Sequence, residues 1–177
     1  MTTLSLLRHA KSSWGDSSLD DFERPLTQRG ASAASKLGRF LAGEKLVPDV
    51  ILCSEAVRAR ATVALLLPEL GAPAPKVVME SALYLALPAA LLERVRKLDG
   101  AERHAMIVAH NPGLHALALS LTADGERDDI AALATKFPTA ALAVITFSSE
   151  RWSAVKPASG RLARFVTPRT LGGGRRR

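Results

Sequence analysis

The chain has 177 residues, 47% of them hydrophobic and 23% charged, which is typical of a single globular domain. A single cysteine, Cys53, excludes an intramolecular disulfide and a cysteine-based zinc finger. The formal net charge of +7 suggests nucleic acid or anionic substrates as partners, but Arg175–Arg177 supply three of these charges and removing them leaves +4. We therefore expect no nucleic-acid partner, one domain over residues 1–168, and a disordered Gly/Arg tail over residues 169–177.

The N-terminal segment lacks the features of a leader. Met1–His9 has no basic residues ahead of its apolar stretch, which is also too short for a signal peptide. The longest apolar-rich stretch, Ala82–Leu92, is broken by Pro88 and is much shorter than the roughly 18 residues of a membrane span. We expect a cytoplasmic protein without membrane contact. The oligomeric state stays open, and a monomer is compatible with the sequence.

Short apolar runs alternate with longer helical patterns along the chain. The six expected strands are Leu4–Leu7, Val50–Cys53, Val77–Met79, Met106–Ala109, Leu142–Phe147 and Arg161–Val166. The five expected helices are Gln28–Ala42, Ala56–Leu67, Pro88–Leu98, Leu114–Leu121 and Asp128–Thr135. Ala31, Ala34, Leu37 and Leu41 share one face of the first helix, which Thr27 can cap and Gly43 can end.

Strands rich in Val, Ile and Leu that alternate with helices predict crossover connections and a mainly parallel sheet with both faces covered. The last two strands are separated by Ser148–Gly160, which shows no helical pattern, so they are expected to close the sheet with an antiparallel edge. The predicted fold is a three-layer α/β/α sandwich with a sheet of about six strands.

Polar side chains follow the expected strands at their carboxyl ends, where ligands bind in open α/β sheets. They are Arg8 and His9 after the first strand, Ser54 and Arg58 after the second, Glu80 after the third, and His110–Gly113 after the fourth. The sequence therefore predicts that histidines, arginines and a carboxylate meet at one edge of the sheet.

This group of side chains suits phosphoryl chemistry. A cationic neighbour lowers the pKa of a histidine, and a neutral imidazole is a good nucleophile toward phosphorus. His9 beside Arg8 fits that role, with a purely structural histidine as the alternative. Arg58 falls near the start of its helix, where the dipole disfavours a cation but attracts the phosphate that a guanidinium binds. Glu80 is a candidate general acid, or else an ordinary surface carboxylate.

Other chemistries lack their motifs. The sequence has no Walker-type phosphate loop and no dinucleotide-binding glycine pattern after the first strand. His110 and His115 are five residues apart and do not share a helical face, and His104 is interpreted as a solvated residue in a polar turn. We expect no metal site and no cofactor.

Four segments in order resemble the histidine phosphatase superfamily, and within it the SixA-like phosphohistidine phosphatases. They are Leu6-Leu7-Arg8-His9-Ala10-Lys11-Ser12-Ser13-Trp14, Arg24-Pro25-Leu26-Thr27 with Gly30, Ser54-Glu55-Ala56-Val57-Arg58-Ala59 with Thr62, and Val108-Ala109-His110-Asn111-Pro112-Gly113. The resemblance runs from about Thr3 to Pro168 and implies a phosphoglycerate mutase-like fold.

The resemblance implies that His9 is a nucleophile that becomes transiently phosphorylated, and that water then hydrolyses the phosphohistidine. Arg8, Arg58 and His110 would bind the phosphoryl oxygens, whereas Ser12, Arg24 and Asn111 would contact substrate and Thr62 would serve helix packing. Two positions depart from the wider superfamily. Ala10 replaces a common glycine, and Gly15 stands where many mutase-like members carry a phosphate-binding asparagine, which argues against a mutase.

Three functions are compatible with these residues. The first is a phosphatase acting on protein phosphohistidine, favoured because Glu80–Met106 holds little beyond one helix and leaves the site open. The second is a small-molecule phosphomonoesterase with the same histidine nucleophile. The third is a non-catalytic phosphate-binding module, which the combination of His9, Arg8, Arg58 and His110 makes improbable.

Overall fold

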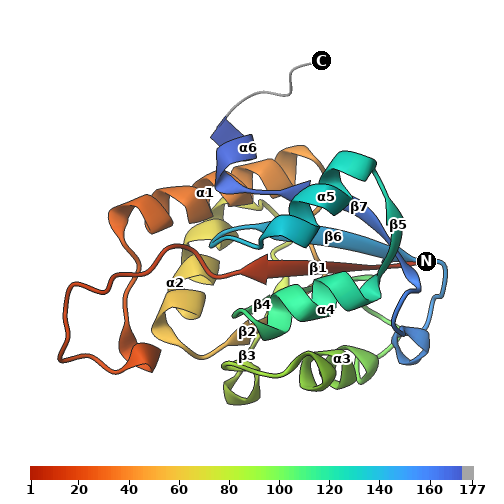
Figure 1. The fold of residues 1–177 in the computed structure, drawn as a ribbon, viewed down its shortest axis with the longest axis horizontal. Helices are drawn as coiled ribbons and strands as arrows, with labels where there is room; N and C mark the ends of the chain where they lie inside the picture. Colours follow the sequence, from red (N-terminus) through yellow and green to blue (C-terminus); the bar gives the residue numbers. More distant parts are fainter. Residues whose placement is uncertain (173–177) are drawn as a thin grey trace.

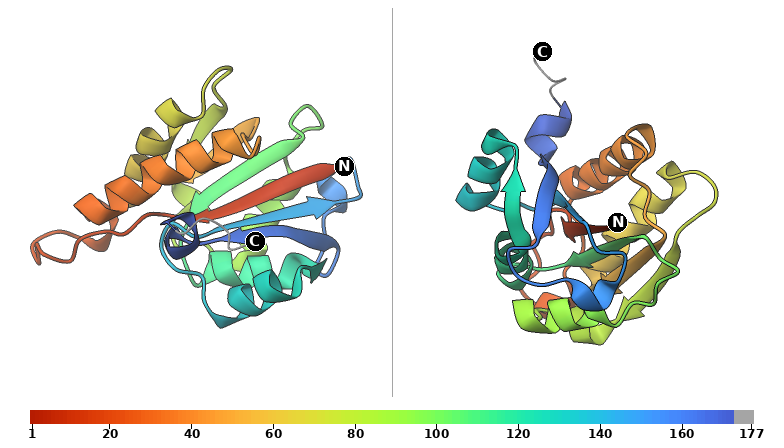
Figure 2. Two further views of the ribbon diagram at one scale, coloured as in Figure 1. Left: turned by 90° about the horizontal axis from the view of Figure 1, so that it is seen from above. Right: turned by 90° about the vertical axis from the view of Figure 1, so that its right-hand side faces the viewer.

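A computed structural model describes residues 1–172, which form a seven-stranded sheet between two layers of helices (Figures 1 and 2). The strands are β1 Thr2–Arg8, β2 Val50–Ser54, β3 Lys76–Glu80, β4 His104–Ala109, β5 Thr122–Gly125, β6 Leu142–Phe147 and β7 Gly160–Val166. Their order across the sheet is β3-β2-β4-β1-β6-β7-β5. The predicted three-layer α/β architecture is confirmed.

The sheet is mainly parallel, as predicted, but its antiparallel part differs from the expectation. β6 runs antiparallel to both of its neighbours, β1 and β7, and lies inside the sheet. The edge on that side is β5, which pairs parallel to β7. β5 was not among the expected strands, because Thr122–Gly125 is short, largely polar and poorly buried and shows no alternation of apolar residues.

Helices cover both faces of the sheet. They are α1 Gln28–Gly43, α2 Val57–Leu66, α3 Pro88–Arg96, α4 Gly113–Leu121, α5 Arg127–Thr135 and α6 Pro168–Gly172. Leu37 of α1 and Val63 of α2 pack with Val108 of β4 on one face. Leu91 of α3 and Leu117 of α4 pack with other residues of β4 on the opposite face (Figure 2). Side chains of one strand alternate between the two cores because successive residues point to opposite faces.

The start and end of α1 follow the local sequence signals. The Thr27 side chain accepts a hydrogen bond from the Gly30 amide at 3.0 Å, and the helix ends at Gly43. Gly30 is required by close packing, because a Cβ there would lie 2.1 Å from the carbonyl oxygen of Lys11. The residues that follow β1 are therefore packed directly against the first turn of α1.

The C-terminal region differs in part from the predicted tail. Pro168–Gly172 forms the short helix α6, so the expected tail begins inside a helix, and its residues 173–177 lie outside the described residues. Across the described residues, no helix combines the length and apolar character needed to cross a membrane.

Candidate active site

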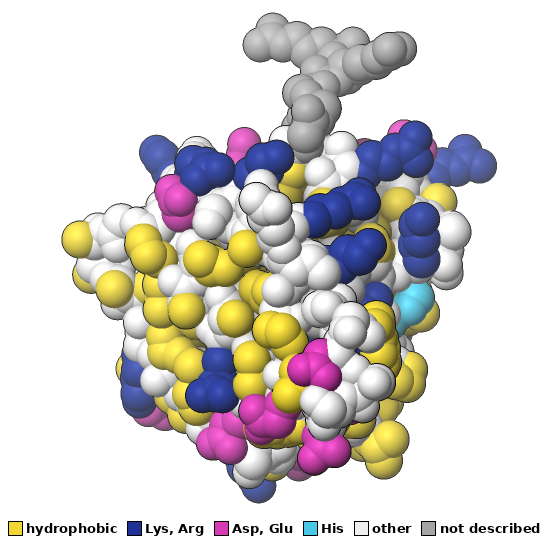
Figure 3. Space-filling view, turned by 90° about the vertical axis from the view of Figure 1, so that its left-hand side faces the viewer, with side chains coloured by type: hydrophobic (Ala, Val, Ile, Leu, Met, Phe, Trp, Pro, Cys, Tyr) yellow, Lys and Arg dark blue, Asp and Glu magenta, His cyan; other side chains and the backbone are white. Residues whose placement is uncertain are grey.

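A cavity of about 480 Å³ opens at the edge where β1, β2 and β4 have their carboxyl ends. Figure 3 views the molecule from this side and shows hydrophobic, basic and acidic side chains together on one face. The cavity is lined by Arg8, His9, Lys11, Ser12, Trp14, Asp21, Arg24, Arg58, Leu85, His110, Asn111 and Thr139. Seven of the eight residues that the sequence singled out therefore meet here, and Glu80 does not.

His9 directly follows β1 and its ring is buried. Ring atom Nδ1 lies 2.7 Å from the carbonyl oxygen of Ala10, and a carbonyl can only accept, so Nδ1 carries the proton. The lone pair is therefore on Nε2, to which Arg58 Nε donates at 3.3 Å. Burial is the main cause that lowers the pKa of His9 to about 3; the Ala10 bond opposes the shift, while His110, Arg58 and Arg8 add to it. At neutral pH His9 is an uncharged imidazole with its lone pair facing an arginine.

Arg58 lies in the first turn of α2, at the position expected from the sequence, and is buried. Ser54 does not cap this helix, because Ala56 occupies the N-cap position, and Ser54 Oγ accepts from the Ala56 amide at 3.3 Å. Thr62 has a larger role than packing. Its hydroxyl donates to the Arg58 carbonyl and accepts the Ala10 amide at 2.9 Å, which ties α2 to the residue after His9.

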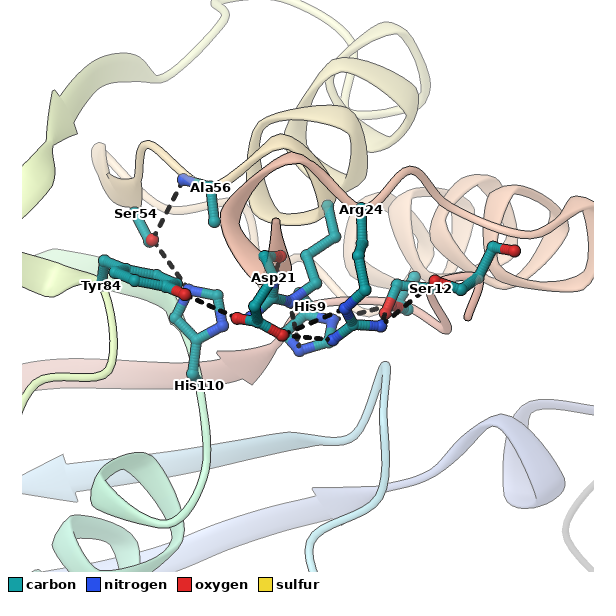
Figure 4. A network of polar contacts seen from close by, with 11 residues as sticks. His9, Ser12, Asp21, Arg24, Ser54, Ala56, Tyr84 and His110 are labelled. Atoms are coloured by element: carbon teal, nitrogen blue, oxygen red, sulfur yellow. Dashed lines mark hydrogen bonds and ion pairs between the residues drawn. The ribbon is translucent and has the colours of Figure 1, made fainter. Parts of the chain in front are cut away.

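His110 follows β4 and lies beside His9, with 5.0 Å between the ring centres (Figure 4). Its Nε2 is 2.8 Å from Ser54 Oγ, whereas its Nδ1 is buried and has no hydrogen-bond partner among the described residues. The pKa of His110 is lowered to about 4, mainly by burial and next by the charge of Arg58. If the Ser54 hydroxyl donates to Nε2, Nδ1 carries a proton that is available to a ligand.

Arg8 and Asn111 share one acceptor, the carbonyl oxygen of Phe137, at 3.1 and 2.8 Å. Arg8 Nε and Asn111 Oδ1 are themselves buried without partners. Together with His110 Nδ1, they are three of the four such side-chain atoms in the described part of the chain, and all three belong to residues that line the cavity. Buried polar atoms are nearly always satisfied, so this concentration marks the place where a polar ligand would bind.

Asp21 connects the arginines of the cavity, from a short 3₁₀ helix at Asp21–Glu23 (Figure 4). Its carboxylate accepts from Arg24 Nε at 3.0 Å, Arg58 Nη2 at 2.9 Å and the Tyr84 hydroxyl at 2.6 Å. Burial opposes its ionisation, but the hydrogen bonds from Tyr84, Arg24 and Arg58 outweigh burial and lower the pKa of Asp21 to about 2. Arg24 also donates to Ser12 Oγ at 2.6 Å, so Ser12 and Arg24 lie together at the cavity.

The arrangement suits an anion. Arg8, Arg24, Arg58 and Lys11 place four cations around one ionised carboxylate, and guanidinium groups bind phosphate oxygens in pairs. The described residues contain no group of three or more His, Cys, Asp or Glu side chains that could hold a metal ion.

The comparisons with known proteins agree with this geometry. The sequence model of the histidine phosphatase superfamily (branch 1) matches residues 4–83. An uncharacterised protein of Mycobacterium leprae is 35% identical over 167 residues, which cover 92% of this chain and all of the relative. A solved structure from Agrobacterium tumefaciens, described as a candidate phosphohistidine phosphatase SixA, is 29% identical with a TM-score of 0.77 and covers 94% of this chain and 98% of its own.

The chain belongs to the histidine phosphatase superfamily. A second SixA structure, from Nakamurella multipartitia, matches with 25% identity and a TM-score of 0.78 over 94% of this chain and 96% of its own. The chain is thus a SixA-like member with a phosphoglycerate mutase-like fold, and its class of activity is that of a phosphatase.

Glu80 is placed differently from the sequence expectation. Both of its carboxylate oxygens accept from Arg94 Nε, at 2.7 and 2.9 Å, and it does not line the cavity. The physical reason is the strand order: Glu80 ends the edge strand β3, three positions from β1, which is roughly 14 Å at the usual strand spacing. Glu80 is therefore not positioned as a general acid in this histidine phosphatase.

Two residues of the site were not predicted from the sequence: Asp21, which lines the cavity, and Tyr84, which does not line it but donates a hydrogen bond to Asp21. Asp21 lies in the polar segment between two matching motifs, and Tyr84 follows a 3₁₀ helix after β3, so neither lies at a strand end. The available signal for Asp21 was its place three residues before Arg24, a spacing that allows an ion pair within one turn.

Proposed function

We propose that this histidine phosphatase hydrolyses protein phosphohistidine through a covalent phosphohistidine intermediate on His9. The observation that carries the proposal is the state of His9. Its Nδ1 proton is held by the Ala10 carbonyl, and its uncharged Nε2 faces the cavity among Arg8, Arg58 and His110. This is the geometry of an activated nucleophile in an anion site.

In the first step, the Nε2 lone pair forms a bond to phosphorus as the bond from phosphorus to the substrate imidazole breaks. The electron pair of the broken bond stays on the leaving imidazole, which is neutral when its other nitrogen carries a proton. His9 becomes a phosphorylated imidazolium, because the Nδ1 proton remains on the ring, and the Ala10 carbonyl at 2.7 Å stabilises that cation.

In the second step, water attacks phosphorus and the bond to Nε2 breaks. The electron pair of that bond returns to Nε2, which restores neutral His9, and both protons of the water leave with the inorganic phosphate as dihydrogen phosphate. In the transition state of both steps, negative charge is spread over the three phosphoryl oxygens. Arg8 Nε and His110 Nδ1 are buried atoms without partners among residues 1–172, and Arg58 lies next to Nε2. Preorganised donors of this kind stabilise the transition state of phosphoryl transfer.

The lack of a protonated carboxyl group that could act as general acid among the described cavity residues favours phosphohistidine over a phosphate ester as substrate. Among the described residues that line the cavity, the one carboxyl group is Asp21, whose pKa of about 2 keeps it ionised at neutral pH. An alkoxide leaving group needs a proton from a general acid, whereas a protonated imidazole leaves as a neutral group. A small-molecule phosphomonoesterase is the second candidate, since the nucleophile and arginines would serve it equally well.

The test is phosphorus NMR of the protein, without added metal, mixed with a chemically phosphorylated histidine protein or, separately, with an alkyl phosphate. We expect the phosphohistidine signal to disappear at least about tenfold faster than the ester signal, and His9→Ala to remove both activities. Faster turnover of the ester would contradict the phosphohistidine assignment. No turnover of either substrate would favour the binding module.

A further inference from the structure

Two large hydrophobic side chains at the mouth of the cavity are exposed to solvent. Trp14 is 77% exposed and Leu85 is 52% exposed, and both line the same cavity as His9. They come from two different connecting segments, Trp14 from the segment after β1 and Leu85 from the segment after β3. Hydrophobic side chains are spread over this face of the molecule (Figure 3). Exposed apolar groups beside a polar site are typical of a surface that binds another molecule.

Trp14 is held in place on one side. The guanidinium carbon of Arg24 lies 3.6 Å from the centre of the Trp14 ring, a cation–π contact. Arg24 is buried and fixed by its bonds to Ser12 and Asp21, so the stacked ring has a defined position above the anion site. A rigid aromatic ring loses little conformational entropy when its free face binds a partner.

Leu85 is exposed in a strained backbone conformation. Its φ of +49° lies in the left-handed region, which is unfavourable for a bulky side chain. The residues on both sides hold it there. The preceding Tyr84 donates to Asp21 at 2.6 Å, and the following Ala86 carbonyl packs so closely on Gly113 that a Cβ there would lie 1.9 Å away. The fold therefore stabilises an exposed leucine at the cavity mouth in a conformation that glycine or asparagine would adopt more easily.

We propose that Trp14 and Leu85 form an apolar rim that binds hydrophobic side chains flanking the phosphorylated histidine of a partner protein. The inference rests on the proposed function and adds the chemistry of the partner surface. The arginines of the cavity complement the charged phosphoryl group, and the rim complements an apolar surface around it. A small polar phosphate ester that fills the cavity leaves the outer faces of both side chains in water, whereas a protein surface covers them.

The test uses two synthetic peptides that carry one phosphohistidine each, flanked by leucines in one and by serines in the other. For the wild type, we expect kcat/KM for the leucine peptide to be about tenfold higher, which corresponds to about 1.4 kcal/mol. In Leu85→Asn this preference should fall to about twofold or less, since asparagine suits the left-handed backbone but removes the apolar group. Trp14→Ser should reduce the preference in the same way, and Trp14→Phe should restore most of it.

Leu119→Ser is the matched control, because Leu119 is a 42% exposed leucine on α4 that does not line the cavity. It should keep the wild-type preference. An unchanged preference in Leu85→Asn and Trp14→Ser, or equal rates on both peptides in the wild type, would overturn the rim while leaving the proposed function intact. Failure of the wild type to hydrolyse either peptide, with rapid turnover of an alkyl phosphate, would overturn the proposed function and the rim together.

Discussion

β4 has a histidine at each end, His104 at its start and His110 just after its last residue. Both rings lie 2.8 Å from a serine hydroxyl, that of Ser5 or Ser54, and burial lowers the pKa of each to about 4. Their surroundings differ. His104 pairs with its serine near Asp49, whereas His110 keeps an unpartnered Nδ1 beside Arg58 and His9.

The comparison shows that a histidine whose pKa is lowered by burial does not by itself mark a catalytic site. The pKa of His104 is lowered in this way, and His104 lies at the amino end of the strand, where the charged neighbour that affects its pKa is Asp49. The interpretation of His104 as a solvated residue is wrong, since it is half-buried and begins β4. His110 differs in three ways: it lies at the carboxyl end of the strand, it shares a cavity with several arginines, and its Nδ1 has no partner among the described residues.

The largest difference between the two histidines is expected when each is replaced by asparagine. His110→Asn should lower kcat about 100-fold, since a donor to the developing phosphoryl charge is lost. His104→Asn should change kcat by less than about twofold, because it does not contact the cavity. Steady-state kinetics on a phosphohistidine protein measures both. Equal losses in the two variants would show that the two environments do not differ in function.

Asp21 is the carboxylate that lies among the arginines on the His110 side of the comparison. Its carboxylate occupies Arg24 and Arg58, so it competes with a phosphate for their donors. Asp21→Asn should lower the inhibition constant of inorganic phosphate about tenfold, since one negative charge next to the anion is removed. Tyr84→Phe, which keeps that charge, is the control. Weaker phosphate binding in Asp21→Asn would show that the carboxylate mainly orients the arginines.

The lowered pKa values also predict how stability depends on pH. The pKa values of His9, His104 and His110 are about 3, 4 and 4, below the ordinary value of 6.5. Between about pH 6.5 and pH 4, the unfolded chain therefore binds protons that the folded protein does not, and the free energy of unfolding falls as pH is lowered. The slope of the free energy of unfolding against pH approaches the value for a difference of three bound protons between the unfolded and folded states.

Urea denaturation at several pH values measures that slope. His104→Asn should remove about one proton from it and leave activity at neutral pH near the wild-type level. A slope that is unchanged in His104→Asn would mean that His104 titrates normally in the folded protein.

The smallest effect is expected for Glu80→Gln, which alters a carboxylate outside the cavity. Turnover of phosphohistidine and of an alkyl phosphate should each change by less than about twofold, while the free energy of unfolding falls by about 1 kcal/mol as the pair with Arg94 weakens. Kinetics and urea denaturation of the same variant check both parts. A large loss on the alkyl phosphate alone would return Glu80 to the role of general acid.

Much of the site could be predicted because parallel strands bring their carboxyl ends to one edge. His9 after β1, Arg58 after β2 and His110 after β4 follow from that rule, and the structure places all three at one cavity. The same rule failed for Glu80, because the rule predicts at which edge of the sheet a residue lies but not the order of the strands along that edge. With β3 at the far edge, Glu80 ends next to Ser54 in register but away from His9.

Tyr84 and Leu85 could not be predicted for a different reason, which also applies to Asp21 beyond its spacing to Arg24. Their positions depend on contacts between two connecting segments that are far apart in sequence, joined by the bond from Tyr84 to Asp21. Connections lack the periodicity that identifies strands and helices, so their side chains cannot be placed from the sequence pattern. The left-handed backbone at Leu85 gives no signal in the sequence, because leucine is not typical of that conformation.

The most direct test of the account is to trap the phosphorylated protein. The wild type is mixed with a phosphohistidine protein, quenched within milliseconds in alkali, which preserves phosphohistidine, and digested for mass spectrometry. We predict a phosphoryl group on His9 in the wild type and in His104→Asn, and none in His9→Ala. Full turnover without any phosphoryl group on His9, or with the group on His110 instead, would contradict a covalent intermediate on His9.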